Sequence, residues 1–294
     1  MTATIIDGRA IADQIRSELC QEVEALKARD TLPGLAFILV GENPSSVSYV
    51  RSKNQGCADV GIYSETLQQP ADIPQDRLLD IIADLNVDPR FHGILVQLPL
   101  PHQLDENTVM SALDTKKDVD GIHPANIGRL LRGEPTYPPA TPAGVQQLLL
   151  RSGHDPAGQH VVICGRSNIV GKPLAAILMQ KQPGANATVT VCHTRTRDLP
   201  DVTRQADILV AAMGQARIIT ADMVREGAVV IDVGNNWLPD ATRKSGRRLV
   251  GDVDFDAVKE KAAAITPVPG GVGPMTVTML LCNTVLAAKG GPTQ

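Results

Sequence analysis

The stretch Val161-Val-Ile-Cys-Gly-Arg-Ser-Asn-Ile-Val-Gly-Lys-Pro173 decides the fold of the C-terminal half of the chain. It opens with an apolar run of strand length, turns at Gly165, and leads into a segment with a helical pattern. A glycine-rich turn in this context places phosphate groups at the N-terminus of the following helix. Ser167 stands where the usual G-x-G-x-x-G pattern has its second glycine. A glycine after a strand is also an ordinary turn, so the prediction of a dinucleotide site rests on the surrounding strand and helix.

Further apolar runs on both sides of this stretch predict parallel strands that are buried on both faces. They are residues 187–192, 207–212 and 228–233 in the C-terminal half, and 34–41 and 93–100 in the N-terminal half. Helical periodicity is found between them, at about residues 11–26, 45–60, 76–86 and 104–113. This alternation predicts an α/β fold with a doubly wound sheet in each half.

The segments that join the two halves have a different composition. Residues 114–140 are rich in turn-forming residues and are predicted to be a connector. A helix is expected from Thr141, as N-cap, and Pro142 to about Arg151. Residues 265–274 contain too many prolines and glycines for a helix, and a last helix is expected at about 275–288.

Length, charge and cysteine content restrict the class of protein. The 294 residues suit two domains. The 28 basic against 32 acidic residues give a net charge of −4, which argues against electrostatic binding of nucleic acid. No apolar run reaches the roughly 18 residues of a membrane span, and no signal peptide is visible. The five cysteines form no C-x-x-C pair, and the histidines lack metal-ligand spacing. We therefore expect a cytoplasmic protein with reduced thiols, no metal and no membrane partner.

The end of the second strand of the dinucleotide half indicates which cofactor would bind. A site for NAD usually has an acidic residue there to bind the ribose hydroxyls. Here the chain continues Cys192-His-Thr-Arg-Thr-Arg197, without an acid, and Arg166 in the first turn can approach the same place. Guanidinium and hydroxyl groups bind a 2′-phosphate, so the pattern favours NADP. A solvated basic loop is the alternative interpretation.

Three features of the N-terminal half are candidates for the reacting site. Tyr49 and Lys53 are spaced i, i+4 on one face of a predicted helix, although most such pairs are surface residues. Short-chain dehydrogenases also carry Tyr-x-x-x-Lys, but there the glycine-rich loop comes first. Gln97 is a polar residue near the carboxyl end of an apolar strand, where open α/β sheets bind ligands, or else a satisfied core amide. Asp118 and Asp120 lie in a turn, where aspartates are usually caps.

Five ordered motifs resemble the bifunctional methylenetetrahydrofolate dehydrogenase/cyclohydrolase family over almost the whole chain. They are Tyr49-Val-Arg-Ser-Lys53, Val96-Gln-Leu-Pro-Leu-Pro101, Lys117-Asp-Val-Asp-Gly121, Gly165-Arg-Ser-Asn-Ile-Val-Gly-Lys-Pro173 and Thr266-Pro-Val-Pro-Gly-Gly-Val-Gly-Pro-Met-Thr276. The resemblance implies two α/β domains around a cleft, the C-terminal one Rossmann-like. It assigns residues 1–140 plus 275–294 to a folate-binding catalytic domain and 141–274 to an NADP-binding domain, usually in a homodimer.

The implied activity belongs to one-carbon metabolism and purine biosynthesis. Methylenetetrahydrofolate is oxidised by NADP to methenyltetrahydrofolate, which water converts to 10-formyltetrahydrofolate. On matching positions, the resemblance makes Lys53 the acid/base, Gln97 its partner, Asp120 a pterin ligand and Tyr49 a stacking partner of the folate. Leu98, Pro269 and Gly273 are further expected substrate contacts. The expected cofactor contacts are Gly165, Arg166, Ser167, Val170, Gly171, His193, Thr194, Arg195 and Gly214.

Two departures and two competing hypotheses accompany this resemblance. Many members have Cys before the Thr-Pro of the connector and Ser at position 194, where this chain has Ala140 and Thr194. The missing thiol argues against a required covalent role at position 140. A dehydrogenase that has lost cyclohydrolase activity is disfavoured by the presence of both Lys53 and Gln97. A non-catalytic module that senses folate or dinucleotide would bind without turnover.

Overall fold

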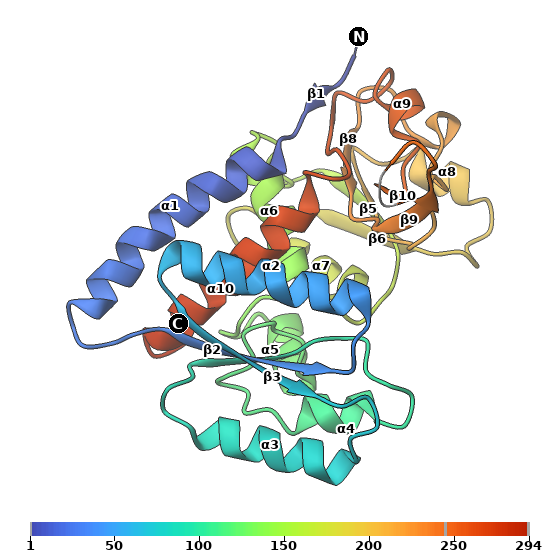
Figure 1. The fold of residues 1–294 in the computed structure, drawn as a ribbon. Helices are drawn as coiled ribbons and strands as arrows, with labels where there is room; N and C mark the ends of the chain where they lie inside the picture. The colour runs from blue at the N-terminus through green and yellow to red at the C-terminus, as the bar shows by residue number, and fades with distance from the viewer. Residues whose placement is uncertain (1, 244–245, 293–294) are drawn as a thin grey trace. The chain divides into compact units, whose positions relative to one another are not determined.

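The computed structural model describes residues 2–243 and 246–292, which form two compact units (Figure 1). The large-sheet unit comprises Met1–Asp13 and Thr141–Thr276. The small-sheet unit comprises Gln14–Ala140 and Val277–Gln294. Two long helices, α1 (Gly8–Lys27) and α10 (Val272–Ala288), each contribute residues to both units.

The large-sheet unit is built on a six-stranded parallel sheet in the order β1-β11-β8-β7-β5-β6. Its strands are β1 (Thr4–Ile5), β5 (His160–Cys164), β6 (Thr188–Cys192), β7 (Ile208–Ala211), β8 (Val229–Asp232) and β11 (Ala264–Ile265). A separate antiparallel hairpin is formed by β9 (Asn236–Pro239) and β10 (Arg247–Val250). The helices are α6 (Ala140–Arg151), α7 (Gly171–Leu178), α8 (Leu199–Thr203), α9 (Phe255–Val258) and the 3₁₀ turn η1 (Ala221–Met223).

The strand order of this sheet places its ligand-binding edge. From β5 the chain passes outward to β6, and then returns to β7 on the other side of β5. Ligands of open α/β sheets bind outside the carboxyl ends of the strands at such a reversal. The glycine-rich turn after β5 therefore lies at the switch point of a Rossmann-like sheet, in agreement with the sequence-based prediction.

The small-sheet unit has three parallel strands in the order β3-β2-β4, namely β2 (Gly34–Val40), β3 (Tyr63–Gln69) and β4 (Gly93–Val96). Its remaining helices are α2 (Pro44–Val60), α3 (Gln75–Val87), α4 (Glu106–Ser111) and α5 (Pro124–Arg132). Alternate residues of β2 and β4, including Ala36, Ile38 and Ile94, pack in one cluster with residues of α3 and α4. Figure 1 shows α2 on the opposite side of this sheet from α3.

Several elements differ from the sequence-based expectations. β3 was not predicted, because its sequence is polar and it forms an edge of the sheet, with most of its side chains exposed or half-buried. The expected connector contains α5, which begins with Pro124 after the capping His123 and ends at Gly133 in the left-handed region. A proline at the start and a glycine after the end could have predicted this helix.

The boundaries of two predicted helices also shift. α6 begins at Ala140, so Thr141 and Pro142 lie within its first turn and Thr141 is not the N-cap. α10 begins at Val272, so Gly273 and Pro274 are helical, where a non-helical segment was expected. A proline in the first helical turn removes an N–H that has no helical partner in any case.

Residues 1–13 cluster with the large-sheet unit, whereas the expected division grouped them with residues 14–140. The reason is that Thr4 and Ile5 of β1 pair in parallel with Ala264 and Ile265 of β11. None of the helices in the described ranges has the length and apolar character needed to cross a membrane. All five cysteines are free thiols.

Candidate active site

Lys53 is positioned by a well-capped helix, α2. The side chain of Asn43 accepts hydrogen bonds from the backbone N–H groups of Ser45 and Ser46, and Pro44 occupies the first turn. At the other end, Gly61 adopts the left-handed conformation that closes the helix (φ 80°). Lys53 lies on the buried face of α2 and is only 8% exposed. A lysine so deeply buried needs a partner, because its charge is otherwise poorly solvated.

Gln97 supplies that partner. It follows the last residue of β4 directly, and its backbone N–H donates to the carbonyl of Ile38 in the neighbouring strand. Its side-chain Nε2 donates to the carbonyl of Leu98 at 2.7 Å. Its Oε1 is thereby directed to Lys53, whose Nζ donates to it at 3.0 Å. The structure thus brings together two of the predicted residues at the carboxyl end of the strand, as the sequence indicated.

The electrostatics of Lys53 and Asp120 are coupled. Burial lowers the pKa of the Lys53 ammonium below its usual value, whereas the negative charge of Asp120 acts in the opposite direction. Burial likewise raises the pKa of Asp120, while Lys53 lowers it and Asp118 raises it. A lysine with a lowered pKa carries a larger fraction of the neutral amine, which is the form that can accept a proton.

Asp120 is held by a network of buried polar groups. The fully buried Asp118 carboxylate accepts hydrogen bonds from the backbone N–H groups of Ile122 and His123 and from Nδ2 of Asn126. The backbone carbonyl of Asp120 accepts from the N–H of Ala140. Asp118 is therefore a structural anchor of the turn that carries Asp120.

Asn283 of α10 supports the same turn from outside. Its Nδ2 donates to the carbonyl of Val119 at 2.8 Å and to that of Pro138 at 2.9 Å. Sequence analysis did not select Asn283, because an Asn within an apolar helix has the appearance of an ordinary core amide. The available signal was a lone amide in the middle of the predicted last helix, between Cys282 and Thr284.

Tyr49 lies one turn before Lys53 on α2 and presents its ring to solvent, with 41% of the residue exposed. Partial burial raises the pKa of its hydroxyl. An exposed aromatic ring beside a buried lysine can stack on a planar ring system.

The loop after β5 has the geometry of a phosphate cradle. Gly165 has φ 142°, and a Cβ there would lie 2.1 Å from the carbonyl oxygen of Ala212. Ser167 Oγ accepts hydrogen bonds from the backbone N–H groups of Val170 (3.1 Å) and Gly171 (3.4 Å), which precede and begin α7. The side chains of Arg166 and Ser167 are exposed. The loop therefore presents charged and backbone donors at the N-terminus of a helix.

The loop after β6 is a compact turn. The backbone N–H of His193 donates to Thr196 Oγ1 (2.9 Å), and the N–H of Arg195 donates to His193 Nδ1 (3.1 Å). Thr194 and Arg195 are exposed at its tip. Since β6 is the immediate neighbour of β5, this basic tip and the Gly165 loop lie at the same edge of the sheet.

The loop after β7 contains the predicted Gly214, in the left-handed region (φ 67°) with open space where a Cβ would be. Sequence analysis missed the group that holds this loop, the buried Asp252 carboxylate. It also missed Asp232 at the end of β8. A carboxylate at the end of the apolar run 228–233 was the signal that could have found Asp232.

The last two predicted substrate contacts belong to the large-sheet unit. Pro269 lies in the loop between β11 and α10, and Gly273 lies in the first turn of α10, with open space around its Cβ position. Within the described ranges there is no cluster of three or more histidine, cysteine or acidic side chains arranged to hold a metal.

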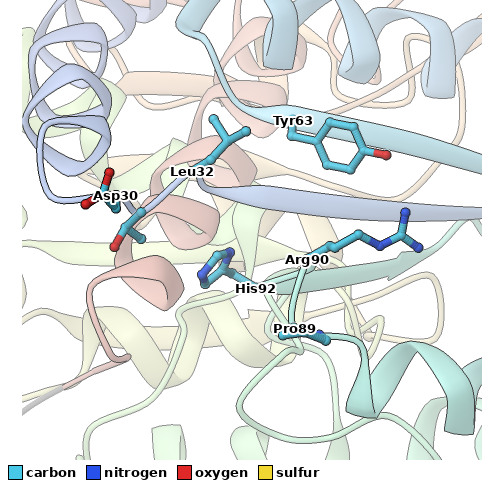
Figure 2. Close-up of a pocket in the computed structure, with 7 residues that line it drawn as sticks. Asp30, Leu32, Tyr63, Pro89, Arg90 and His92 are labelled. Atoms are coloured by element: carbon cyan, nitrogen blue, oxygen red, sulfur yellow. The ribbon is translucent and has the colours of Figure 1, made fainter.

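A pocket of about 460 Å³ in the small-sheet unit is separate from these residues (Figure 2). It lies at the amino ends of the strands, and the side chains of Tyr63, Arg90 and His92 are among those that line it. Arg90 forms ion pairs with Asp88 and Glu65. Gln97 is at the opposite, carboxyl end of β4, so this pocket is not the candidate active site.

A compact α/β unit with a buried lysine and a Rossmann-like unit with a phosphate cradle define a dinucleotide-dependent enzyme. Comparison with known proteins identifies its family. Residues 6–120 match the model of the tetrahydrofolate dehydrogenase/cyclohydrolase catalytic domain, and residues 139–291 match the NAD(P)-binding domain of the same family. The chain belongs to the tetrahydrofolate dehydrogenase/cyclohydrolase family.

Individual relatives agree with that assignment. The chain is 59% identical over 290 residues to the bifunctional protein FolD of Dehalococcoides mccartyi (strain CBDB1), covering 98% of each chain. Its fold matches the crystal structure of the FolD methylenetetrahydrofolate dehydrogenase/cyclohydrolase of Campylobacter jejuni, with a TM-score of 0.92 and 46% identity over 98% of this chain and 99% of that one. It also matches the Trypanosoma brucei enzyme complexed with NADP and an inhibitor, with a TM-score of 0.93 and 41% identity over 98% of each chain.

The predicted family, fold class and bifunctional activity are thereby confirmed. The chain is a dehydrogenase and cyclohydrolase acting on tetrahydrofolate derivatives in one-carbon metabolism, with a nicotinamide dinucleotide as cofactor.

Proposed function

We propose that this chain oxidises 5,10-methylenetetrahydrofolate with NADP and hydrolyses the 5,10-methenyltetrahydrofolate product to 10-formyltetrahydrofolate, with Lys53 as the proton-transfer group. The observation that carries the proposal is the buried Lys53 amine, held 3.0 Å from Gln97 Oε1 and electrostatically coupled to Asp120. We assign catalysis and most of the folate contacts to the small-sheet unit, and NADP binding to the large-sheet unit.

Oxidation places a modest demand on the protein. The methenyl product is a cation that two nitrogens of the folate stabilise, so the step requires positioning more than a strong base. When bound, NADP supplies the hydride acceptor. The exposed ring of Tyr49 stacks on the folate, and Leu98, Pro269 and Gly273 are its further proposed contacts.

Hydrolysis requires removal of a proton from the attacking water. A free lysine has a pKa of about 10.4 and is almost fully protonated near neutrality. Burial lowers the pKa of Lys53, and a bound cationic substrate would lower it further by repulsion. Gln97 orients Nζ through a neutral acceptor, so it positions the amine without adding a charge that would favour the ammonium.

Asp120 is proposed to bind the pterin. The amino-pyrimidine part of the pterin presents N–H donors, which a carboxylate matches in a paired arrangement. The anchoring of this turn by Asp118 and Asn283 fixes the direction of approach of the Asp120 side chain.

The cofactor loops fit NADP. Glycines at positions 165 and 171 let the loop backbone pack closely on itself and on Ala212, and Gly214 has open space where a Cβ would be. Ser167 and Val170 shape the turn. Arg166, Thr194 and Arg195 are exposed at neighbouring strand ends and are proposed to bind the 2′-phosphate. The half-buried His193 lies beside them and is a further proposed cofactor contact. No acidic side chain follows β6 within Cys192–Arg197 to repel that phosphate.

One absorbance assay tests the proposal. Purified protein is mixed with methylenetetrahydrofolate and either NADP or NAD, and the reduced cofactor and the methenyl compound are followed at separate wavelengths. We expect reduction of NADP in preference to NAD, followed by loss of the methenyl signal. Cofactor binding without turnover would support a sensing module, and accumulation of the methenyl compound would support a dehydrogenase without cyclohydrolase activity.

We also propose a cytoplasmic homodimer that contributes to purine biosynthesis and binds no nucleic acid. The free thiols support a reducing compartment. β3 is an edge strand whose unpaired backbone groups can pair with a second copy. Light scattering would return the mass of two chains if the dimer forms, and the 31.3 kDa mass of one chain if it does not.

A further inference from the structure

A buried carboxylate behind the cofactor loops has no role in the chemistry described above. Asp252 lies just after β10 and is fully buried. Its Oδ2 accepts hydrogen bonds from two successive backbone N–H groups, those of Met213 (2.5 Å) and Gly214 (2.8 Å). Its Oδ1 accepts from Nδ2 of Asn236 at 2.8 Å. All three partners are donors, so the site is built for a carboxylate.

Asp252 is itself fixed by a second carboxylate. Asp232, at the end of β8, accepts at Oδ1 from the N–H groups of Gly234 (2.8 Å) and Asp252 (2.9 Å), and at Oδ2 from that of Val253 (2.9 Å). A Cβ at Gly251 would lie 1.8 Å from Asp232 Oδ2. The two aspartates thus connect the end of β8 to the loop after β7 through tightly packed backbone.

The loop after β7 also contacts the phosphate cradle. The carbonyl oxygen of Ala212 lies where a Cβ of Gly165 would be, at 2.1 Å. β7 is the neighbour of β5 at the switch point of the sheet. A displacement of residues 212–214 would therefore change both the Gly214 turn and the space available to the Gly165 turn.

We infer that Asp252 is a positioning residue for cofactor binding, because its carboxylate fixes the Met213–Gly214 backbone at the carboxyl end of β7. It does not touch the cofactor. The carboxylate holds two N–H groups of this glycine-containing turn in one orientation. The loop is therefore preorganised before NADP binds. The inference rests on the NADP site of the proposed function.

A double-mutant cycle with Asn236 tests it. Asp252→Asn replaces one acceptor with an N–H₂ group that faces either the two backbone N–H groups or the amide of Asn236. Asn236→Asp alone brings two carboxylates together. The double variant, Asp252→Asn with Asn236→Asp, restores an acceptor opposite every donor. Asp256→Asn, which removes an exposed carboxylate paired with Lys259, is the matched control.

The readouts are the Kd of NADP by calorimetry, KM for NADP against KM for methylenetetrahydrofolate, and the thermal unfolding midpoint. In Asp252→Asn we expect the Kd and KM of NADP to rise about tenfold or more, with a much smaller change in KM for the folate, because charge-assisted hydrogen bonds are lost at the cofactor loop alone. The double variant should recover most of the NADP affinity. Asp256→Asn should bind NADP as the wild type does.

Two results would overturn the inference. One is unchanged NADP binding in Asp252→Asn, and the other is a double variant that binds no better than the single variant, which would indicate a general structural role. If Asp252→Asn does not fold, the double variant decides alone by its folding and its NADP affinity. Failure of the wild-type protein to bind NADP would refute the proposed function. The same titration distinguishes that result from a failure of the inference on Asp252, because it measures the wild type and the variants separately.

Discussion

The two functional regions of the molecule are constructed in opposite ways. In the small-sheet unit, the proposed chemistry depends on the side chains of Lys53, Gln97 and Asp120, and the charges of Lys53 and Asp120 are partly removed from water. In the large-sheet unit, the cofactor loops depend on backbone and on exposed side chains, and the buried carboxylates Asp232 and Asp252 hold them from behind. Burial therefore changes the proton affinity of a reacting group in the first region, whereas in the second region buried carboxylates fix the backbone.

The largest effect on activity is expected when the Lys53 amine of the first region is removed. Lys53→Met keeps most of the apolar stem and should lower cyclohydrolase activity by about 10²–10⁴-fold, since a positioned base contributes that much. Some dehydrogenase activity should survive, so methenyltetrahydrofolate should accumulate in a coupled absorbance assay.

Lys53→Arg is the control for the charge. A guanidinium stays protonated at neutral pH and cannot accept the proton, so this variant should recover little cyclohydrolase activity. Normal hydrolysis by Lys53→Arg, or retention of both activities by Lys53→Met, would remove Lys53 from the role of base.

In the second region, the buried carboxyl group of Asp232 should affect how the stability of the protein depends on pH. Burial raises the pKa of Asp232 to about 6, although three backbone N–H groups act to lower it. An unfolded aspartate has a pKa of about 3.9, so between about pH 4 and 6 the folded protein binds more protons than the unfolded chain. This group therefore lowers the free energy of unfolding as pH rises through that window, by about 3 kcal/mol for a shift of about two units.

Carbon-13 NMR of the Asp232 carboxyl group checks this directly. A titration midpoint near 6 in the folded protein is the expected result. A midpoint near 4 would mean that the three donors offset the effect of burial and that Asp232 does not destabilise the protein at neutral pH.

Arg166 belongs to the second region, and the effect of its removal should be confined to one cofactor. Arg166→Ala removes an exposed guanidinium and should raise KM for NADP about ten- to a hundredfold, the value of one charge-assisted hydrogen bond. KM for NAD, which lacks the 2′-phosphate, should change little. Equal effects on both cofactors would exclude Arg166 from the 2′-phosphate site.

Most of the buried strands and the placement of most site residues could be predicted from the sequence, because a continuous apolar run indicates a buried strand. Residues 34–40, 93–96 and 161–164 are continuous apolar runs that form strands. Most of the predicted site residues lie at or just after strand ends, or on the helix that follows, and Asp120 in its turn is an exception. β3 could not be found in that way, since a polar edge strand gains its stability from hydrogen bonds to β2 and not from burial.

Asp252 shows the other limit of sequence analysis. Gly251-Asp-Val-Asp254 has the composition of an ordinary acidic turn. Asp252 is fully buried, whereas Asp254 in the same turn is half-buried. The difference is explained by the donors that Asp252 meets, namely the backbone N–H groups of Met213 and Gly214 and the amide of Asn236. Backbone donors carry no sequence signature, so this positioning role required the structure.

Burial and Asp120 together are proposed to set the proton affinity of Lys53, and the pH dependence of cyclohydrolase kcat/KM measures that affinity. That profile reports the pKa of the essential base in the free enzyme. We expect the wild-type rate to rise with pH with a midpoint below the value of about 10.4 for free lysine. In Asp120→Asn the maximal rate should fall, and the midpoint should move to lower pH, because the charge that stabilises the ammonium is gone. An unmoved midpoint in this variant, or one that moves to higher pH, would contradict the account.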